Sequence, residues 1–393
     1  MPPGSKQGRG NNMGKVGILT FHCADNYGAV LQAYALMQTI RKWNLDVEII
    51  DFCPLEIVHP YTQFVNIKYT LKERGFLRTI KELIRRGIAY RDIKRRRKNF
   101  KEFRDKYLKL SSMTYRTRIS LIQGKPVYDF YITGSDQVWN PDFFKNLDGT
   151  YFLDFADKPA SKISYAASIA KEVSDDDAKY FEKYLGDFDF ISVREKSSKE
   201  FVSRYANCEV AVTLDPTLLV SKEAWNEIIA FDLPKFKYVL VYDLFKDPVT
   251  IAVSNIIAKE FNCKIISYSK KSGYHNWHRS FSSDNPVEFL GLVQNAEFVV
   301  TNSYHGTIFS IIFNKPFFTI PHPTRGSRMI DLLSELNLED RIIRQLDDIQ
   351  DKRKHMSFED ANRKLLHLRD QSIDFLAKAL GMKNEHANEK IFI

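Results

Sequence analysis

Short apolar runs alternate with longer amphipathic stretches along most of the chain. The runs Lys15 to Phe21 and Asp46 to Phe52 have the length and the β-branched content of buried parallel strands. Between them, the stretch Ala29 to Trp43 carries apolar residues at helical spacing. A second series begins with the strand Tyr238 to Tyr242 and the helix Val249 to Phe261. We therefore predict an α/β fold with parallel sheets, built in two halves.

The most informative unit is a predicted strand, polar turn and helix between residues 298 and 320. The apolar strand ends at Thr301, and an almost entirely apolar helix begins near Gly306. Ligands of open α/β sheets bind at the carboxyl ends of the strands, where a helix N-terminus suits an anion. The turn therefore predicts an anion site around His305, which could contact a negative charge or donate a proton. In the alternative interpretation, Ser303 only caps the helix and His305 is a hydrogen-bonded structural residue.

Two further polar loops follow predicted strands in the first half. The loop after the first strand contains Asp25 and Asn26, and it matches neither a GxGxxG fingerprint nor a Walker loop. These two side chains either cap the next helix or face a substrate in a cleft. The loop at residues 134–141 combines Asp, Gln, Trp and Asn, a set that suits a sugar. Its alternative is a turn whose Trp139 packs in the core.

Arg194 also stands at the carboxyl end of a predicted strand, directly before a helix. A guanidinium at that place could clamp a carboxylate or a phosphate, because its planar fork matches both groups. The alternative is a surface ion pair with Glu195 or Glu200, which would contribute little to stability.

The length of the chain, 393 residues, exceeds one ordinary core, so we expect two domains of similar size. We place the N-terminal α/β domain at residues 13–230, with a basic helical insertion at 66–110. The C-terminal α/β domain spans 231–350, and a helix with a tail, 351–393, packs across the boundary. Residues 1–12 are polar and glycine-containing, and we interpret them as a cloning remnant outside the fold.

The net charge of +9 comes from one segment. Residues 68–109 hold 17 Lys and Arg against 5 Asp and Glu, whereas the rest of the chain holds 41 against 44. Apolar and aromatic residues interleave with these cations, and the simplest interpretation is a solvated helix face. The second is a basic amphipathic helix on an anionic membrane surface. Nucleic acid is disfavoured as a partner, because no DNA- or RNA-binding motif accompanies the charge.

The composition also excludes several classes of protein. A run of about 18 apolar residues and a secretory signal are both absent from the sequence. We therefore expect a cytoplasmic protein, with a peripheral position at the inner face of the cytoplasmic membrane as the alternative. The four cysteines lack paired spacing, so neither a metal site nor a disulfide framework is predicted. They are Cys23, Cys53, Cys208 and Cys263.

Four polar motifs stand at these strand ends: DNYGAVLQ at 25–32, GSDQVWN at 134–140, Arg194-Glu195, and NSYHGT at 302–307. Together they resemble the polysaccharide pyruvyl transferase family, over nearly the whole chain. Members of that family are similar in fold to GT-B glycosyltransferases, in which two Rossmann-like domains with parallel sheets face a central cleft. The resemblance implies transfer of pyruvate from phosphoenolpyruvate to a sugar, which gives a cyclic ketal.

The resemblance also implies roles for single residues. The family binds phosphoenolpyruvate with an arginine and a histidine, which match Arg194 and His305. Some members carry another arginine two residues before the histidine, where this chain has Ser303. Arg325 or Arg328 could supply the missing cation, a suggestion from position alone. The other residues expected around phosphoenolpyruvate are Tyr304, Gly306 and Thr307.

Formation of the ketal needs a proton on the methylene carbon of phosphoenolpyruvate, and His305 is our candidate acid. Asp136 and Asp25 are the candidate bases for the attacking hydroxyls. The scheme needs no metal and no cofactor, since phosphoenolpyruvate is a co-substrate. We expect the acceptor to be a capsule, exopolysaccharide or cell-wall sugar carried on a lipid diphosphate. The residues expected to bind it are Asn26, Tyr27, Ser135, Gln137, Trp139 and Asn140.

Two other functions fit the same pattern. One is a GT-B glycosyltransferase that uses a nucleotide-sugar donor, and the other is a glycan-binding protein without catalytic activity. Analogy of fold cannot separate these from pyruvyl transfer. Thermal stabilisation by phosphoenolpyruvate rather than by nucleotides would favour pyruvyl transfer.

Overall fold

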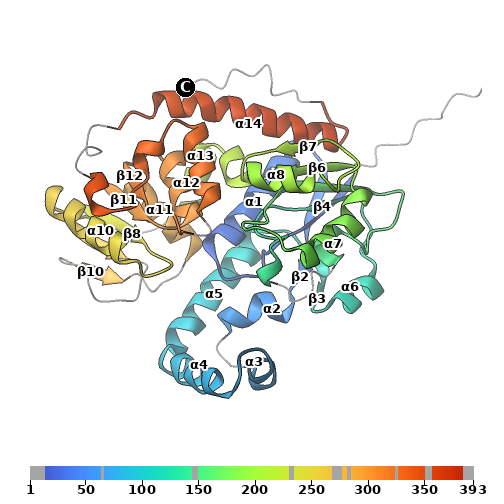
Figure 1. Cartoon of the computed structure of the whole chain (residues 1–393), viewed down its shortest axis with the longest axis horizontal. Coiled ribbons are helices and arrows are strands. Elements are labelled where there is room, and N and C mark those ends of the chain that lie inside the picture. Colours follow the sequence, from blue (N-terminus) through green and yellow to red (C-terminus); the bar gives the residue numbers. More distant parts are fainter. Residues whose placement is uncertain are drawn as a thin grey trace, which may run out of the picture.

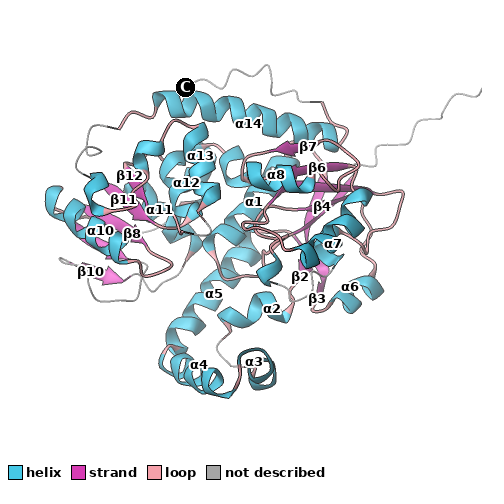
Figure 2. Cartoon of the chain, in the orientation of Figure 1, coloured by secondary structure: helices cyan, strands magenta, loops and turns pink. Residues whose placement is uncertain are grey.

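A computed structural model describes residues 14–62, 66–143, 149–229, 234–267, 277–280, 285–323, 326–349 and 356–383. Two parallel sheets with helices packed around them make up these residues (Figure 1, Figure 2). The larger sheet has the strand order β3-β2-β1-β4-β5-β6-β7 and the smaller has β10-β9-β8-β11-β12.

The strands of the larger sheet come from the first half of the chain, and those of the smaller sheet from the second. The larger sheet contains β1 (Lys15–Leu19), β2 (Asp46–Phe52), β3 (Leu110–Tyr115), β4 (Phe130–Thr133), β5 (Ser161–Ala167), β6 (Phe190–Val193) and β7 (Val210–Val212). The smaller contains β8 (Tyr238–Tyr242), β9 (Lys264–Ser267), β10 (Trp277–Ser280), β11 (Phe298–Thr301) and β12 (Phe317–Thr319).

Helices connect most of the strands. In the first half they are α1 (Tyr27–Arg41), α2 (Leu55–Val58), α3 (Ile67–Arg74), α4 (Phe76–Ile88), α5 (Tyr90–Tyr107), α6 (Arg118–Gly124), α7 (Asp175–Tyr184), α8 (Lys196–Val202) and α9 (Lys222–Ile228). In the second half they are α10 (Pro248–Glu260), α11 (Pro286–Asn295), α12 (Tyr304–Ile312), α13 (Ser327–Glu335) and α14 (Glu359–Ala379).

The two halves share one apolar core. A single cluster of buried side chains includes residues of α1 from the first half and of α11 and α12 from the second. At its centre the ring of Tyr27 stacks on Phe289, with ring centroids 4.6 Å apart and planes 13° apart. Trp225 meets Phe309 edge-on at 5.2 Å. Because burial of such large rings is strongly favourable, these contacts hold the two halves together.

The terminal helix α14 connects the halves a second time, across the top of Figure 1. Near its start, Asp360 accepts a hydrogen bond from Asn337 of the second half at 2.9 Å. Further along, Ser372 Oγ accepts from the backbone N–H of Leu214 at 3.0 Å, and Arg369 donates to the carbonyl of Leu218. The chain therefore returns to the first half after completing the second.

The predicted fold class is confirmed, with differences in detail. Strand β3 was not predicted, because its sequence LSSMTY is mostly polar and its side chains are largely exposed at the sheet edge. Helix α12 begins at Tyr304 rather than near Gly306, since the side chain of Ser303 caps it. The predicted domain boundary at residue 230 and the N-terminal residues 1–12 lie outside the described residues.

The basic segment forms three helices, α3, α4 and α5. Helix α5 packs on the body of the first half through Phe100 and Phe103, which are buried. Helices α3 and α4 extend away from both sheets, at the lower edge of Figure 1. We call these two helices the helical arm. Among the helices that the structure describes, none combines the length and the apolar character needed to cross a bilayer.

Candidate active site

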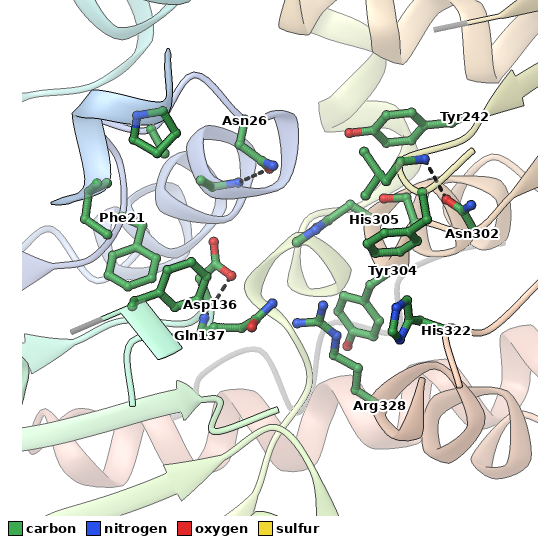
Figure 3. Close-up of a pocket in the computed structure, with 18 of the residues that line it drawn as sticks. Phe21, Asn26, Asp136, Gln137, Tyr242, Asn302, Tyr304, His305, His322 and Arg328 are labelled. Carbon is green, nitrogen blue, oxygen red and sulfur yellow. Dashed lines mark hydrogen bonds between the residues drawn. The ribbon is translucent and has the colours of Figure 1, made fainter. Parts of the chain in front are cut away.

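A cavity of about 210 Å³ lies between the two halves, at the carboxyl ends of both sheets. Figure 3 shows side chains of the first half facing those of the second across it. From the first half it is lined by Phe21, Ala24, Asn26, Ala29, Glu56, Ile57, Pro60, Tyr61, Asp136, Gln137 and Phe143. From the second half it is lined by Tyr242, Leu244, Phe245, Asn302, Ser303, Tyr304, His305, His322, Arg328 and Met329.

Helix N-termini from both halves meet at this cavity. Asn26 caps α1 by accepting from the N–H of Ala29, and Ser303 caps α12 by accepting from the N–H of Gly306. Arg328 lies in the first turn of α13. A helix N-terminus carries a partial positive charge and unpaired N–H groups, so the convergence favours an anionic ligand.

His305 lies in the first turn of α12 and lines the cavity with a side chain that is 11% exposed. Its Nε2 is 3.5 Å from Oδ2 of Asp215, and this carboxylate is fully buried. On another side, the ring lies against Gly28, where an added β-carbon would be 2.0 Å from Nδ1. The imidazole is thus held between the two halves, with one edge at the cavity.

Arg194 lies behind His305 and not in the cavity wall. Its Nη1 donates to Oδ2 of Asp215 at 2.7 Å, and its side chain is 1% exposed. Ser135 Oγ lies 3.4 Å from both groups. Burial alone would raise the pKa of Asp215, but His305 and then Arg194 hold it well below its usual range. Asp215 is therefore ionised, and it links the predicted arginine to the predicted histidine.

Arg328 supplies a cation directly at the cavity, as Figure 3 shows. Its guanidinium lies 5.2 Å from the centre of the Tyr304 ring, and that of Arg194 lies 4.7 Å from the same centre. The carboxamide oxygen of Gln137, in the orientation that satisfies its neighbours, is 2.9 and 3.0 Å from the two Nη atoms of Arg328. Burial and then the charge of Arg194 lower the pKa of Arg328. An anion at this position would offset both effects.

Asp136 faces this cation from the first half (Figure 3). Its backbone has φ of +85°, a conformation that non-glycine residues rarely adopt. The carboxylate accepts the N–H of Gln137 at 2.8 Å and lines the cavity. Backbone strain of this kind concentrates at functional sites, and here it directs a carboxylate into the cleft.

Several residues predicted to bind the acceptor lie elsewhere. Trp139 is fully buried, stacks on Phe152 at 5.4 Å and donates to the carbonyl of Tyr151, so it packs in the core and presents no face to a sugar. Asn140, 1% exposed, does not line the cavity, and neither does Tyr27 in the shared core. For Trp139 the alternative interpretation of the loop, a turn whose indole packs in the core, is therefore the correct one.

Three further residues predicted at the site, Asp25, Gly306 and Thr307, do not line the cavity. Asp25 is 2% exposed and pairs with Arg104 of α5 at 2.9 Å, so it does not line the cavity. Gly306 packs against Thr301, and Thr307 is buried on the inner side of α12. Arg325 lies outside the described residues.

Some residues in the cavity wall or directly behind it were missed by sequence reasoning. Asp215 stands in a short Asp-Pro-Thr turn after β7, where it accepts a hydrogen bond from the N–H of Thr217. That local role accounts for an Asp at this position, so the local sequence offered no reason to expect its contact with His305. Tyr61, Tyr242 and Phe245 come from segments without a recognisable motif. Their shared signal is position at the carboxyl edge of a sheet or in the loop beside it.

One group among the described residues has the geometry of metal ligands: His22, Asp51 and Cys53. It lies outside the cavity lining. His22 Nε2 is 2.9 Å from Asp51 Oδ1, and the Cys53 thiol donates to the same oxygen at 3.1 Å. The three groups satisfy one another by hydrogen bonding, so their proximity is explained without an ion.

Two α/β halves with parallel sheets and a ligand-sized cavity between them define a protein of the GT-B-like class. The fold of UDP-N-acetylglucosamine 2-epimerase from Rickettsia bellii is similar: the TM-score is 0.50, the identity is 12%, and the match covers 94% of this chain and 98% of that one. S. aureus MnaA in complex with UDP gives a TM-score of 0.48 at 10% identity, covering 95% and 98%.

The family follows from a comparison of sequence. The family model for polysaccharide pyruvyl transferase matches residues 26–323, most of the chain, and the chain belongs to this family of enzymes that transfer pyruvate. A search of curated proteins gave no match.

Proposed function

We propose that this enzyme transfers the pyruvyl group of phosphoenolpyruvate to two hydroxyls of a hexose in a precursor of a bacterial surface polysaccharide, with release of phosphate. The observation that carries the proposal is that His305 and Arg328 line one cavity, with Asp215 buried behind His305 as its partner. Family membership supplies the reaction class, and the geometry supports the assignment of residues to roles.

The donor has two anionic groups, a phosphate and a carboxylate, close together on one small molecule. Arg328 offers a planar guanidinium to one of them, and the N-termini of α1 and α12 offer N–H groups and a positive field to the other. Arg194 does not line the cavity and acts indirectly, through its ion pair with Asp215 and its position over the ring of Tyr304. It fixes the positions of other groups and does not touch the ligand.

The reaction has four steps, with His305 as the proton donor. A proton passes to the methylene carbon of phosphoenolpyruvate, and the adjacent carbon becomes an electrophile. One hydroxyl of the sugar attacks that carbon, the bond to phosphate breaks with its electron pair, and a second hydroxyl of the same sugar closes the ring. His305 gives its proton to the new methyl group and recovers one from the first attacking hydroxyl, and the proton of the second hydroxyl leaves on phosphate, so the enzyme returns to its starting state.

The acceptor would lie on the side of the cavity formed by the first half. Asp136 is the candidate base, because its carboxylate faces the cleft from the opposite side to His305. Asn26 and Gln137 offer amides to hydroxyls, and the rings of Phe21 and Tyr61 offer apolar faces to a pyranose. We extend the proposal to a hexose carried on a lipid diphosphate, because the basic segment 68–109 would suit such an acceptor at a membrane surface.

The direct test is to incubate the enzyme with phosphoenolpyruvate and a panel of nitrophenyl hexosides. Phosphate release is measured, and mass spectrometry looks for an added pyruvyl group. We expect phosphate and ketal in equal amounts, and loss of at least about a hundredfold in rate for His305→Gln. His367→Gln, an exposed histidine on α14, is the matched control. Wild-type turnover in His305→Gln would remove the proposed acid.

Binding of the donor is tested without any acceptor. Phosphoenolpyruvate at millimolar concentration is expected to raise the melting temperature, whereas UDP-sugars are not. Stabilisation by UDP-sugars alone, with transfer of the sugar, would replace the proposal by glycosyl transfer.

A further inference from the structure

An ordinary surface helix buries its apolar side and exposes its polar side, and helix α4 of the arm has the reverse arrangement. Its buried residues are polar: Thr79 and Arg86. Arg86 donates to the carbonyl of Thr62 at 2.9 Å and to that of His59 at 3.0 Å, and it pairs with Glu82 at 2.7 Å. The polar side of the helix therefore attaches it to the protein.

The apolar side of α4 faces outward. The exposed fractions are 74% for Leu77, 59% for Ile84 and 85% for Ile88, and Phe76 is 68% exposed. Helix α3 adds Ile67 at 50%. Single exposed apolar residues are ordinary, but a whole helix face of them on a projecting arm marks an interaction surface.

Cations border this apolar face. On α4 itself, Arg78, Lys81 and Arg85 lie beside it and are exposed. Beyond the arm, a groove of about 750 Å³ runs along α5. The basic residues that line it include Arg91, Lys94, Arg97, Lys98 and Lys101, whereas Arg104, which also lines it, pairs with the buried Asp25. An apolar strip with a basic border is the pattern of helices that lie in the interface of an anionic bilayer.

We propose that the helical arm docks on an anionic lipid bilayer, with α4 parallel to the membrane plane and its apolar face among the acyl chains. The neighbouring cations of α4 and α5 then lie at the level of the phosphate headgroups. The charge favours a bilayer over a protein partner, because a protein partner would need an acidic border of matching length around an apolar groove. Since α4 has only 13 residues, it lies on the membrane and does not cross it.

Docking would attach the acceptor side of the active site to the membrane through the arm. The segment that holds Arg86, His59 to Thr62, also contributes Pro60 and Tyr61 to the wall of the cavity. The arm and the acceptor side of the cleft are therefore parts of one structural unit. This consequence rests on the proposed function, since it would place the cleft where a sugar on a lipid diphosphate can enter. Bilayer docking itself does not depend on it.

The test is sedimentation of the full chain with sucrose-loaded vesicles. We expect binding to phosphatidylcholine vesicles that contain phosphatidylglycerol, weak binding to phosphatidylcholine alone, and a decrease with added salt. Leu77→Glu combined with Ile88→Glu is expected to lower the partition coefficient at least about tenfold, because two apolar side chains no longer enter the bilayer. Ile119→Glu with Val127→Glu, at similarly exposed positions outside the arm, is the control and keeps wild-type binding.

Two further measurements distinguish insertion into the bilayer from self-association of the chain. Ile84→Trp is expected to show a blue shift of its fluorescence on vesicle binding, since the indole enters an apolar medium. Equal sedimentation of wild type and of the double variant Leu77→Glu, Ile88→Glu would overturn the proposal. So would light scattering that shows a wild-type dimer converted to a monomer by the same pair of changes, because the face would then join two copies.

The activity of the double variant separates docking from the proposed reaction. Phosphate release from soluble hexosides is expected to remain at the wild-type rate when Leu77 and Ile88 are both changed to Glu, because neither residue lines the cavity. Loss of vesicle binding with activity retained therefore supports docking by itself. Vesicle binding by a wild-type protein that releases no phosphate would instead count against the proposed reaction and leave docking established.

Discussion

His305 of the second half lies directly against Gly28 of the first. A β-carbon at position 28 would be 2.0 Å from Nδ1 of the imidazole and 2.3 Å from Cε1. On another side the ring meets Asp215, also from the first half. The position of the proposed acid is therefore set by contacts across the boundary between the halves, and it requires a residue without a side chain at position 28.

Gly28→Ala is expected to displace His305 and to lower the rate of phosphate release about a hundredfold, since an error of about 1 Å in a catalytic group has that effect. The stability of the protein should change little, because the imidazole edge can move toward the cavity. Rates and urea unfolding are measured on the same preparation. Gly87→Ala, where an added β-carbon meets nothing within 4 Å, serves as control and retains full activity. Full activity in Gly28→Ala would mean that the observed position of the ring is not required.

Asp215→Asn is expected to impair both stability and catalysis. The buried guanidinium of Arg194 pairs with Asp215 at 2.7 Å and with Glu195 at 3.5 Å, and the change removes the charge of the nearer carboxylate. Loss of one partner of a buried ion pair costs about 3–5 kcal/mol. We expect the free energy of unfolding in urea to fall by about that amount.

The catalytic effect of Asp215 is separated by a pH profile. As a positioning residue for His305, Asp215 should shift the pH dependence of kcat when it is changed, which a purely structural residue would not do. Asp176→Asn, an exposed partner of Lys179, is the control and changes neither quantity. An unaltered pH profile in Asp215→Asn would limit the aspartate to a structural role.

Arg328→Lys tests the cation at the cavity. A lysine keeps the charge but loses the planar fork that can hold a phosphate or carboxylate with two hydrogen bonds. We expect KM for phosphoenolpyruvate to rise about tenfold with a smaller change in kcat, and Arg328→Ala to have a larger effect. Arg363→Lys, on the exposed side of α14, leaves both constants unchanged. The assignment fails if kcat alone falls while KM stays at the wild-type value.

The sequence predicted the architecture well because parallel strands are read from short apolar runs. Strand β2 and strand β11 have the predicted bounds, and both are buried, so their apolar character is local and visible. Strand β3 escaped prediction because it lies at the edge of the sheet and is mostly polar. An edge strand is recognised by its pairing with a neighbouring strand, and the local sequence pattern does not reveal that pairing.

Residues around the candidate site were predicted less evenly. His305, Ser303 and Asp136 stand directly at strand ends, and topology alone brings strand ends to the cleft. Trp139 stands in the same kind of loop, yet it packs inward on Phe152, because the direction of a side chain depends on tertiary packing. Asp215 could not have been chosen from its turn, since its contact with His305 joins positions far apart in the chain.

Stability is also expected to depend on pH through His22, which is buried beside Asp51 in the first half. Burial by itself would lower the pKa of His22, but hydrogen bonds with Asp51 and Cys53 raise it to about 9. The folded state therefore holds this proton more tightly than the unfolded chain, whose histidine has an ordinary pKa. The stabilisation is complete below about pH 6.5 and is lost as the pH rises toward 9, a change of roughly 3 kcal/mol.

Urea unfolding at a series of pH values between about 6 and 10 measures this loss. The His22→Gln variant, less stable throughout, should lack the decline between about pH 6.5 and 9, while His367→Gln should follow the wild-type curve because that histidine is exposed. Other groups titrate at the upper end of the range, so the difference between the two variants, and not the absolute curve, carries the result. Parallel curves for wild type and His22→Gln would mean that His22 is neutral in the folded protein and that Asp51 accepts from it as an uncharged ring.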